Sequence, residues 1–194
     1  MMQLSTNKGF PALNNTQIKY IACFFMLLDH FALILLPGDT FPYLLLRGLG
    51  RLAAPLFFWT ISEGAHYSKH KGKYLGILLG FGVLFQLFFM GFSGEELSIL
   101  GFLSSYKNIF ITLSIGLMGL FTLEKAGGKL FPAMLIAGVF SIAGSLLNVD
   151  YGWYGILMIF IFYYFREKKS SLFLGIVLLN LSYFVVASSS GNFL

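Results

Sequence analysis

Long apolar runs separated by short polar segments dominate the chain. The first extends from Ile18 to Leu36; about 19 residues at 1.5 Å each cover roughly 28 Å, the hydrocarbon thickness of a bilayer. A second predicted helix begins between residues 44 and 52 and ends near residue 64, and others cover about 74–90, 108–123, 130–147, 153–165 and 172–187. Such continuous runs favour helices over the alternating strands of a membrane barrel. The pattern predicts an all-α, polytopic transmembrane bundle of about seven spans.

The composition supports this prediction. The chain is 57% hydrophobic and only 11% charged, with a mean hydropathy of +0.80, whereas soluble domains carry about 25% charged residues. The net charge of +5 does not indicate a nucleic-acid partner, because excess lysine and arginine in a membrane protein mainly mark the cytoplasmic loops. The single cysteine, Cys23, excludes an internal disulfide.

Two segments interrupt the apolar pattern. Residues 1–17 are polar and contain Gly9 and Pro11, which predicts a flexible tail. Residues 97–106 are too short to span a bilayer, and they are expected to lie at its surface. Residues 18–194 are expected to form a single transmembrane domain.

Basic residues fall in alternate loops. They form four groups: Lys8 and Lys19; Lys69, Lys71 and Lys73; Lys125 and Lys129; and Arg166, Lys168 and Lys169. The positive-inside rule then places the N-terminal tail in the cytoplasm and, with seven spans, the C-terminus outside. The same topology gathers a set of polar and aromatic residues at the outer side of the membrane. The set comprises Asp29, His30, Arg47, Arg51, Asn108, Thr112, Asn148, Asp150, Tyr151, Trp153 and Tyr154.

Asp29 and His30 stand side by side in the first apolar run. A charge at bilayer depth costs about 2.5–3.5 kcal/mol on insertion scales, so an intramembrane Asp-His pair is a functional hypothesis. His30 is the candidate general base, because an imidazole titrates near neutral pH and can take a proton from an amine or hydroxyl. A histidine satisfied by a carboxylate or carbonyl between helices is the alternative. Asp29 could orient His30 or pair with either Arg47 or Arg51.

Arg47 and Arg51 are four residues apart and share one face of the second predicted helix. Two guanidinium groups on one face can clamp a phosphate or carboxylate. Snorkelling to the outer membrane surface is the alternative.

The inner end of the second predicted helix carries Glu63, and His66 and His70 follow just beyond it. The two histidines have the i, i+4 spacing of a metal pair, but the sequence supplies no further convincing ligand, and we expect no metal. Glu63 is expected to be a buried partner for a lysine. The candidates for contact with anionic lipid or with the phosphates of a cytoplasmic ligand are Lys69, Lys71 and Lys73.

Two further groups supply polar side chains at the outer side. Asn108 and Thr112 are spaced one turn apart at the start of the fourth predicted helix. The DYGWYG stretch, Asp150 to Gly155, places one carboxylate and three aromatic residues in a tight turn between helices. Aromatic residues there are also ordinary membrane anchors.

Four motifs, in order, resemble the TraX family of polytopic membrane acetyltransferases, whose namesake acetylates the N-terminus of F-pilin. They are IKYIACFFMLLDH, then LRGLGRLAAPLF followed by SEGAHYSKHKGKYL, then NIFITLSIGL, and finally LLNVDYGWYGILMIFIFYYFR. The resemblance covers about residues 18–166, with mild departures at Trp59, Ser62 and Ile111. The family is also similar, more distantly, to the larger group of membrane acyltransferases that includes envelope-glycan O-acetylases.

The resemblance implies an acetyl-CoA donor that enters from the cytoplasm and a membrane-embedded histidine, for which His30 is the matching position. Asp29 would then act beside His30. Residues implied to bind the acceptor or stabilise the transition state are Arg47, Arg51, Asn108, Thr112, Asp150, Tyr151, Trp153 and Tyr154. Residues implied to meet CoA are Glu63, His66, Lys69, Lys71 and Lys73.

The implied protein is a multi-pass enzyme of the bacterial cytoplasmic (inner) membrane, and its acceptor is a pilin or an envelope glycan. Membrane lipid is a further partner, no nucleic acid is expected, and a homodimer is left open. Two alternatives use the same residues. An ion-coupled transporter would use the Asp-His pair and the arginines as a proton relay or anion site, and a non-catalytic pilus or envelope assembly factor would use them structurally.

Overall fold

The computed structural model describes residues 14–38, 40–93 and 108–189. Most of the predicted tail and the whole predicted surface segment at 97–106 lie outside these ranges. The described helices are α1 (Asn15–Leu35), α2 (Phe41–Gly50), α3 (Ala53–Tyr67), α4 (Lys71–Ser93), α6 (Ile109–Lys125), α7 (Leu130–Leu146), α8 (Gly152–Tyr164) and α9 (Lys169–Ser189). These ranges contain no strand, so the all-α prediction is confirmed.

Several predicted boundaries were wrong. Helix α4 is three residues longer at each end than the predicted 74–90, and α9 begins at Lys169 rather than at about residue 172. The first helix begins at Asn15 rather than Ile18, because Asn14 and Gln17 form a capping box. The Asn14 side chain accepts from the Gln17 amide at 2.8 Å, and the Gln17 side chain accepts from the Asn14 amide at 2.9 Å, which satisfies two helix-end donors. The second predicted helix is two helices, since α2 ends at Gly50 and α3 begins at Ala53.

Several helices are long and apolar enough to cross a membrane. Among the described residues these are Asn15–Leu35, the α2–α3 segment Phe41–Tyr67, Lys71–Phe88 and Lys169–Val186. The chain is therefore a membrane protein. Helices α6, α7 and α8 have 17, 17 and 13 residues, fewer than the roughly 20 of a typical span, so the number of seven spans stays a prediction.

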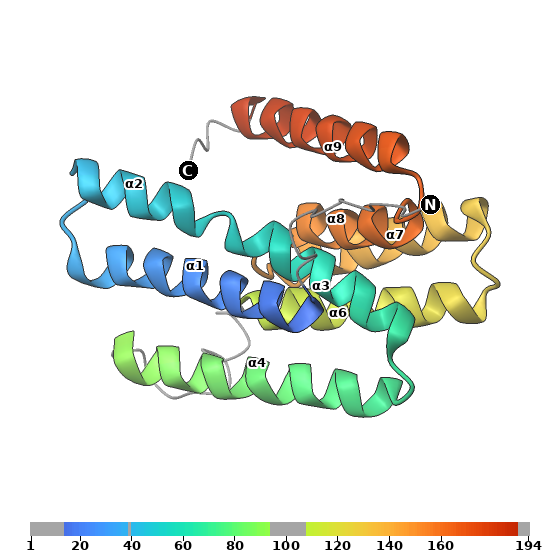
Figure 1. Cartoon of the computed structure of the whole chain (residues 1–194), viewed down its shortest axis with the longest axis horizontal. Helices are drawn as coiled ribbons and strands as arrows, with labels where there is room; N and C mark the ends of the chain where they lie inside the picture. The colour runs from blue at the N-terminus through green and yellow to red at the C-terminus, as the bar shows by residue number, and fades with distance from the viewer. Residues whose placement is uncertain (1–13, 39, 94–107, 190–194) are drawn as a thin grey trace, which may run out of the picture. The chain divides into compact units, whose positions relative to one another are not determined.

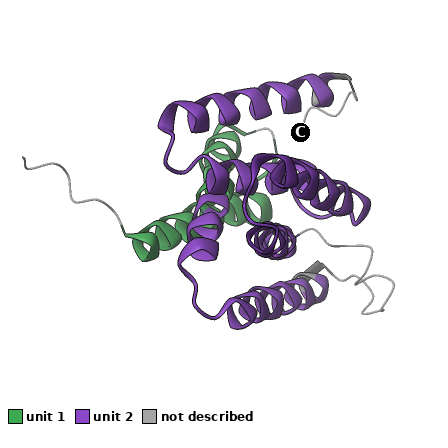
Figure 2. Cartoon of the chain, turned by 90° about the vertical axis from the view of Figure 1, so that its right-hand side faces the viewer, with its two compact units in different colours: residues 1–56 green, residues 57–194 purple. Residues whose placement is uncertain are grey.

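The chain divides into two compact units, residues 1–56 and 57–194 (Figure 2). In the first unit, α1 and α2 form an antiparallel hairpin joined by the turn after Pro37 (Figure 1). The prediction of a single domain stays a prediction, and each unit is described separately below.

The second unit is organised around α6, which contacts α4, α7 and α8, while α9 packs on α8. Fully buried side chains of α6 and α8 form the centre, among them Leu117, Leu120 and Ile159. Glycines on α6 allow this close packing, because a Cβ at Gly116 would lie 2.4 Å from Ile159. The α3–α4, α6–α7 and α8–α9 turns all lie at one end of this unit (Figure 1). We call this the basic end, because most of the lysines lie in these turns or in the helix ends next to them.

Candidate functional site

His30 lies in the last two turns of α1 and is half-buried. Its Nδ1 is 2.8 Å from the backbone carbonyl oxygen of Met26, one turn earlier. A carbonyl oxygen can only accept, so Nδ1 must carry the proton in this contact. In the neutral ring the lone pair then lies on Nε2, which is the form that a general base requires.

Asp29 pairs with Arg47 of α2. The Arg47 Nη1 donates to Asp29 Oδ2 at 2.5 Å, and the two side chains are only 24% and 20% exposed. The sequence left Arg47 and Arg51 as equal partners, and the structure selects Arg47. The other carboxylate oxygen, Oδ1, is buried and accepts no hydrogen bond within the described part of the chain. One oxygen of the Asp29 carboxylate is therefore paired with a cation, and the other is not.

Gly50 is a residue of this site that sequence reasoning missed. A Cβ at position 50 would lie 2.4 Å from the Cβ, 2.8 Å from the Cα and 2.8 Å from Oδ1 of Asp29. Only glycine therefore allows α2 to approach α1 closely enough at this point. The available signal was an isolated glycine inside a helical pattern, which commonly has a packing reason.

Arg51 differs from Arg47 in its contacts. It is the C-cap residue of α2 and is exposed, and the described residues offer it no ion pair. Arg47 is already neutralised by Asp29. The structure thus has one ion pair and one exposed guanidinium, and a clamp on a phosphate or carboxylate stays a prediction.

At the opposite end of the second unit from the basic end, Thr112 and Asp150 come together. The fully buried Thr112 hydroxyl donates to the backbone carbonyl of Asp150 in the turn between α7 and α8. This turn has positive φ at Asn148 (53°), Tyr151 (59°) and Gly152 (42°). Left-handed backbone at a bulky residue such as Tyr151 is costly and is maintained only by surrounding contacts.

Those contacts come from α3 and α6. The Tyr151 ring meets the buried Phe58 ring edge-on at 5.5 Å between centroids, with an interplanar angle of 85°. A Cβ at Gly155 would lie 3.0 Å from Phe58, Thr112 and Tyr151. The turn is therefore held from several sides, and Asp150, which is half-buried, is presented on it.

Asn108 has the contacts of a structural residue. It caps α6 by accepting from the Ile111 amide at 3.2 Å, and its side-chain amide donates to Gly82 at 3.1 Å and to Gln86 at 3.0 Å. Both donors and one acceptor are thus used inside the fold, and the residue is only 7% exposed. Asn108 joins α6 to α4, and Gln86 was not identified from the sequence.

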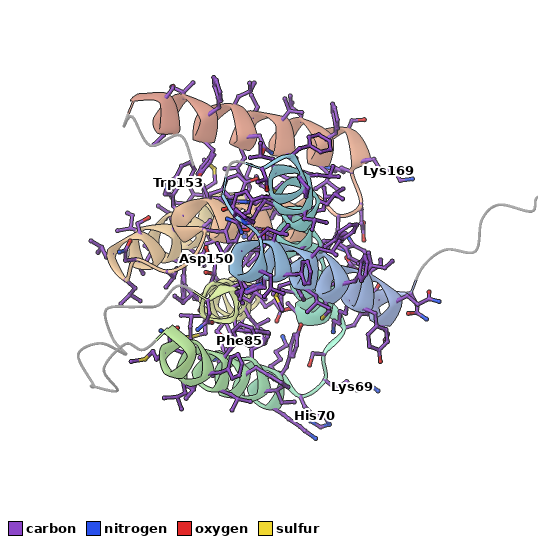
Figure 3. All side chains as sticks on the ribbon, turned by 90° about the vertical axis from the view of Figure 1, so that its left-hand side faces the viewer. Lys69, His70, Phe85, Asp150, Trp153 and Lys169 are labelled. Atoms are coloured by element: carbon purple, nitrogen blue, oxygen red, sulfur yellow. The ribbon has the colours of Figure 1, made fainter. Side chains whose placement is uncertain are left out.

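Trp153 and Tyr154 contact α9. Their rings lie 6.0 and 4.8 Å from the ring of Tyr183, and the Tyr154 hydroxyl donates to the Asn180 side chain at 3.1 Å. Trp153 lies in the first turn of α8 (Figure 3). These contacts give both residues a packing role between α8 and α9, while their binding of a substrate stays a prediction.

At the basic end, Glu63 pairs with Arg166 rather than with a lysine as predicted. The Arg166 Nη2 lies 3.8 Å from Glu63 Oε2 and donates to the Tyr67 hydroxyl at 2.9 Å. Burial lowers the pKa of Arg166, but the Tyr67 hydrogen bond and the Glu63 charge more than offset this, so its pKa is raised. Arg166 therefore stays cationic at every accessible pH.

Lys71 is held by Glu124 of α6, and the Tyr163 hydroxyl donates to the same carboxylate at 2.9 Å. The Lys71 ammonium also lies 5.3 Å from the centre of the Phe121 ring. Lys71, Gly72, Phe121, Glu124 and Lys125 line an open cavity of about 430 Å³, which is within the size range of ligand sites.

The other predicted CoA contacts are more exposed. His66 packs edge-on against Tyr67 at 4.9 Å, and Lys73 is exposed on the first turn of α4. Lys69 and His70 point outward from the turn before α4 (Figure 3). Among the described residues, no three His, Cys, Asp or Glu side chains are close enough to hold a metal.

Within each unit, the structure brings some of the predicted site residues together. Asp29 and Arg47 meet in the first unit, next in sequence to His30. Within the second unit, Thr112, Asp150 and Tyr151 meet at one end, and Glu63, Lys71 and their partners lie at the other.

Comparison with known proteins decides the family. The sequence profile described as TraX protein matches residues 14–192, which covers every helix described above. The chain belongs to the TraX family. A curated relative, "Probable fimbrial assembly protein FimC, serogroup H1" from Dichelobacter nodosus, is 32% identical over 171 residues, which cover 86% of this TraX-family chain and 68% of the relative. No solved structure matches it.

Proposed function

We propose that this TraX-family protein is a membrane acetyltransferase that moves an acetyl group from acetyl-CoA to an amine or hydroxyl acceptor, with His30 as the general base. The observation that carries the proposal is the His30–Met26 contact of 2.8 Å, which leaves the lone pair of the neutral ring on Nε2. The family resemblance supplies the acetyl donor. An idle histidine in an apolar span would also be costly to retain.

The proposed reaction balances with one proton carrier. His30 Nε2 takes the proton from the acceptor amine or hydroxyl as its nitrogen or oxygen attacks the thioester carbonyl. The C–S bond then breaks, and the CoA sulfur leaves as a thiolate that takes the proton from the His30 imidazolium. The products are the acetylated acceptor and free CoA, and His30 returns to its neutral form.

Asp29 and Arg47 support this site as a fixed ion pair. Their charges cancel over a 2.5 Å contact, so the pair adds polarity beside His30 without a net charge inside an apolar helix. Asp29 Oδ1 is buried and accepts no hydrogen bond within the described residues, and in this proposal it accepts one from an N–H or O–H group of the acceptor once binding of the acceptor has exposed it. This assigns Asp29 to acceptor binding and Arg47 to holding Asp29.

We further propose that the protein lies in the bacterial inner membrane and that its acceptor is a pilin or another envelope component. The D. nodosus relative is named a probable fimbrial assembly protein, which favours the pilin. Acetyl-CoA would arrive from the cytoplasm, where exposed Lys69 and Lys73 can meet its phosphates.

The test is acetyl transfer from radiolabelled acetyl-CoA by the purified protein, with pilin or envelope glycan as acceptor. We expect His30→Ala and His30→Gln to lower kcat by at least about 10²-fold, the usual size of a general-base effect. His70→Ala, on an exposed turn, is the matched histidine control and is expected to keep full activity. Transfer that is unchanged in both His30 variants would refute the assigned role.

A non-catalytic assembly factor is the second candidate, and the name of the D. nodosus relative favours it. In that case the purified protein would show no acetyl transfer, and His30→Gln would leave pilus assembly unaffected in cells if the protein still folds. Loss of assembly in a folded His30→Gln variant would instead support the enzyme.

A further inference from the structure

We infer that the cavity at the basic end, between the start of α4 and the end of α6, binds the phosphodiester headgroup of an anionic membrane lipid. The inference does not rest on acetyl transfer, because the cavity residues lie outside the proposed catalytic group. Five residues line it: Lys71, Gly72, Phe121, Glu124 and Lys125. Its volume of about 430 Å³ exceeds what a bare ion needs and suits a headgroup.

The position of the cavity favours a membrane lipid as its ligand. Lys71 is the first residue of the apolar segment Lys71–Phe88, which is long enough to cross a membrane. Lys125 is the last residue of α6. Both lysines therefore lie where apolar helices end, at the depth of lipid headgroups, and the excess of lysines at this end predicts the cytoplasmic leaflet.

The net charge of the residues that line the cavity favours a headgroup with a phosphodiester. Two lysines and one glutamate leave a single positive charge, which matches the single negative charge of a phosphatidylglycerol headgroup. Lys71 is balanced by Glu124, whereas Lys125 is exposed and makes no ion pair within the described residues. Lys125 is thus the cation available to the phosphate.

The rest of the lining suits a lipid as well. Gly72 has no side chain, and a Cβ there would meet no atom within 4 Å, so the backbone at the start of α4 is open to a ligand. Phe121 supplies an apolar surface to the lining of the cavity. One turn earlier on α6, Met118 is 43% exposed and continues this apolar surface for an acyl chain to follow.

The experiment titrates the full-length purified protein in detergent with phosphatidylglycerol, and phosphatidylcholine serves as the neutral lipid. Native mass spectrometry gives the apparent Kd for each. We expect preferential binding of phosphatidylglycerol, and we expect Lys125→Gln to raise its Kd about fivefold, as for the loss of about one near-surface lysine contact. Lys129→Gln is the matched control, because Lys129 is exposed in the same loop and does not line the cavity.

A second variant tests whether the charge of the cavity controls binding of the lipid. Glu124→Gln removes the negative charge while its amide oxygen can still accept from Tyr163, so phosphatidylglycerol should bind more tightly. Equal losses in Lys125→Gln and Lys129→Gln would overturn the inference, because they would indicate general attraction to a basic surface. Lys125-dependent binding of soluble adenosine 3′,5′-bisphosphate without binding of phosphatidylglycerol would also overturn it.

Discussion

At the scale of single residues, the Asp29–Arg47 pair shows how an apolar helix can carry a charge. The pair is about four-fifths buried on both sides, and desolvating two charges is costly unless they contact each other closely. Each partner therefore needs the other. Removing one leaves an uncompensated buried charge, which is more harmful than removing both.

Arg47→Gln alone should lower the free energy of unfolding by about 3–5 kcal/mol, because Asp29 would lose the one cation that it contacts among the described residues. The double variant Asp29→Asn with Arg47→Gln should recover part of this loss, since two amides can hydrogen-bond without charge. Thermal unfolding of the purified protein in detergent measures both. Arg51→Gln is the control and should have little effect, because Arg51 is exposed. A double variant no more stable than Arg47→Gln would contradict the reasoning.

At the scale of helices, two glycines in α2 have opposite expected effects. An added Cβ at Gly50 would collide with backbone and side-chain atoms of Asp29, whereas at Gly48 it would meet nothing within 4 Å. Gly50→Ala should therefore destabilise the protein by about 1–3 kcal/mol as helices α1 and α2 are forced apart. Gly48→Ala should stabilise it by about 0.5–1 kcal/mol, because alanine loses less entropy in a helix. Thermal unfolding of the two variants side by side measures the contrast, and a Gly50→Ala protein as stable as Gly48→Ala would show that the helices are not in close contact there.

The turn between α7 and α8 depends on the Thr112 hydroxyl. Thr112→Val keeps the shape but removes the donor to the Asp150 carbonyl, so the turn with positive φ at Tyr151 should open more often. Hydrogen exchange of the peptide that covers residues 148–155 should become faster in Thr112→Val. Thr112→Ser keeps the hydroxyl and should exchange at nearly the wild-type rate. If the two variants exchange equally, the hydrogen bond does not hold the turn.

The helices could be predicted from the sequence, but the side-chain pairs that join one helix to another could not. Apolar runs set the bounds of α7 and α8 to within about one residue, because each run ends at a polar turn. The break between α2 and α3 was missed because the apolar pattern continues across it. The choice of Arg47 over Arg51 depends on which turn of α2 faces α1. The pairing of Lys71 with Glu124 joins residues far apart along the chain, which local patterns do not encode.

At the scale of the whole molecule, the positive-inside prediction concerns the two ends of the second unit, and the orientation of these ends in the membrane stays a prediction. The turns rich in lysine all lie at one end of this unit (Figure 1), and the Thr112–Asp150 contact lies at the other. Helix α7 connects the two ends, from its N-cap Lys129 to its C-cap Leu147. Its 17 residues cover about 26 Å at 1.5 Å per residue, so the two caps should lie near opposite membrane surfaces.

Single cysteines at these two caps test the orientation. Replacing Cys23 by serine removes the only native thiol, and Lys129→Cys or Leu147→Cys then adds one at either end of α7. A membrane-impermeant maleimide applied to intact spheroplasts should label Leu147→Cys and leave Lys129→Cys unlabelled until the membrane is permeabilised. The opposite pattern would place the basic end outside the cell. Labelling of both in intact spheroplasts would show that α7 does not cross the membrane, and the cytoplasmic lipid site and cytoplasmic CoA entry would then have to be abandoned together.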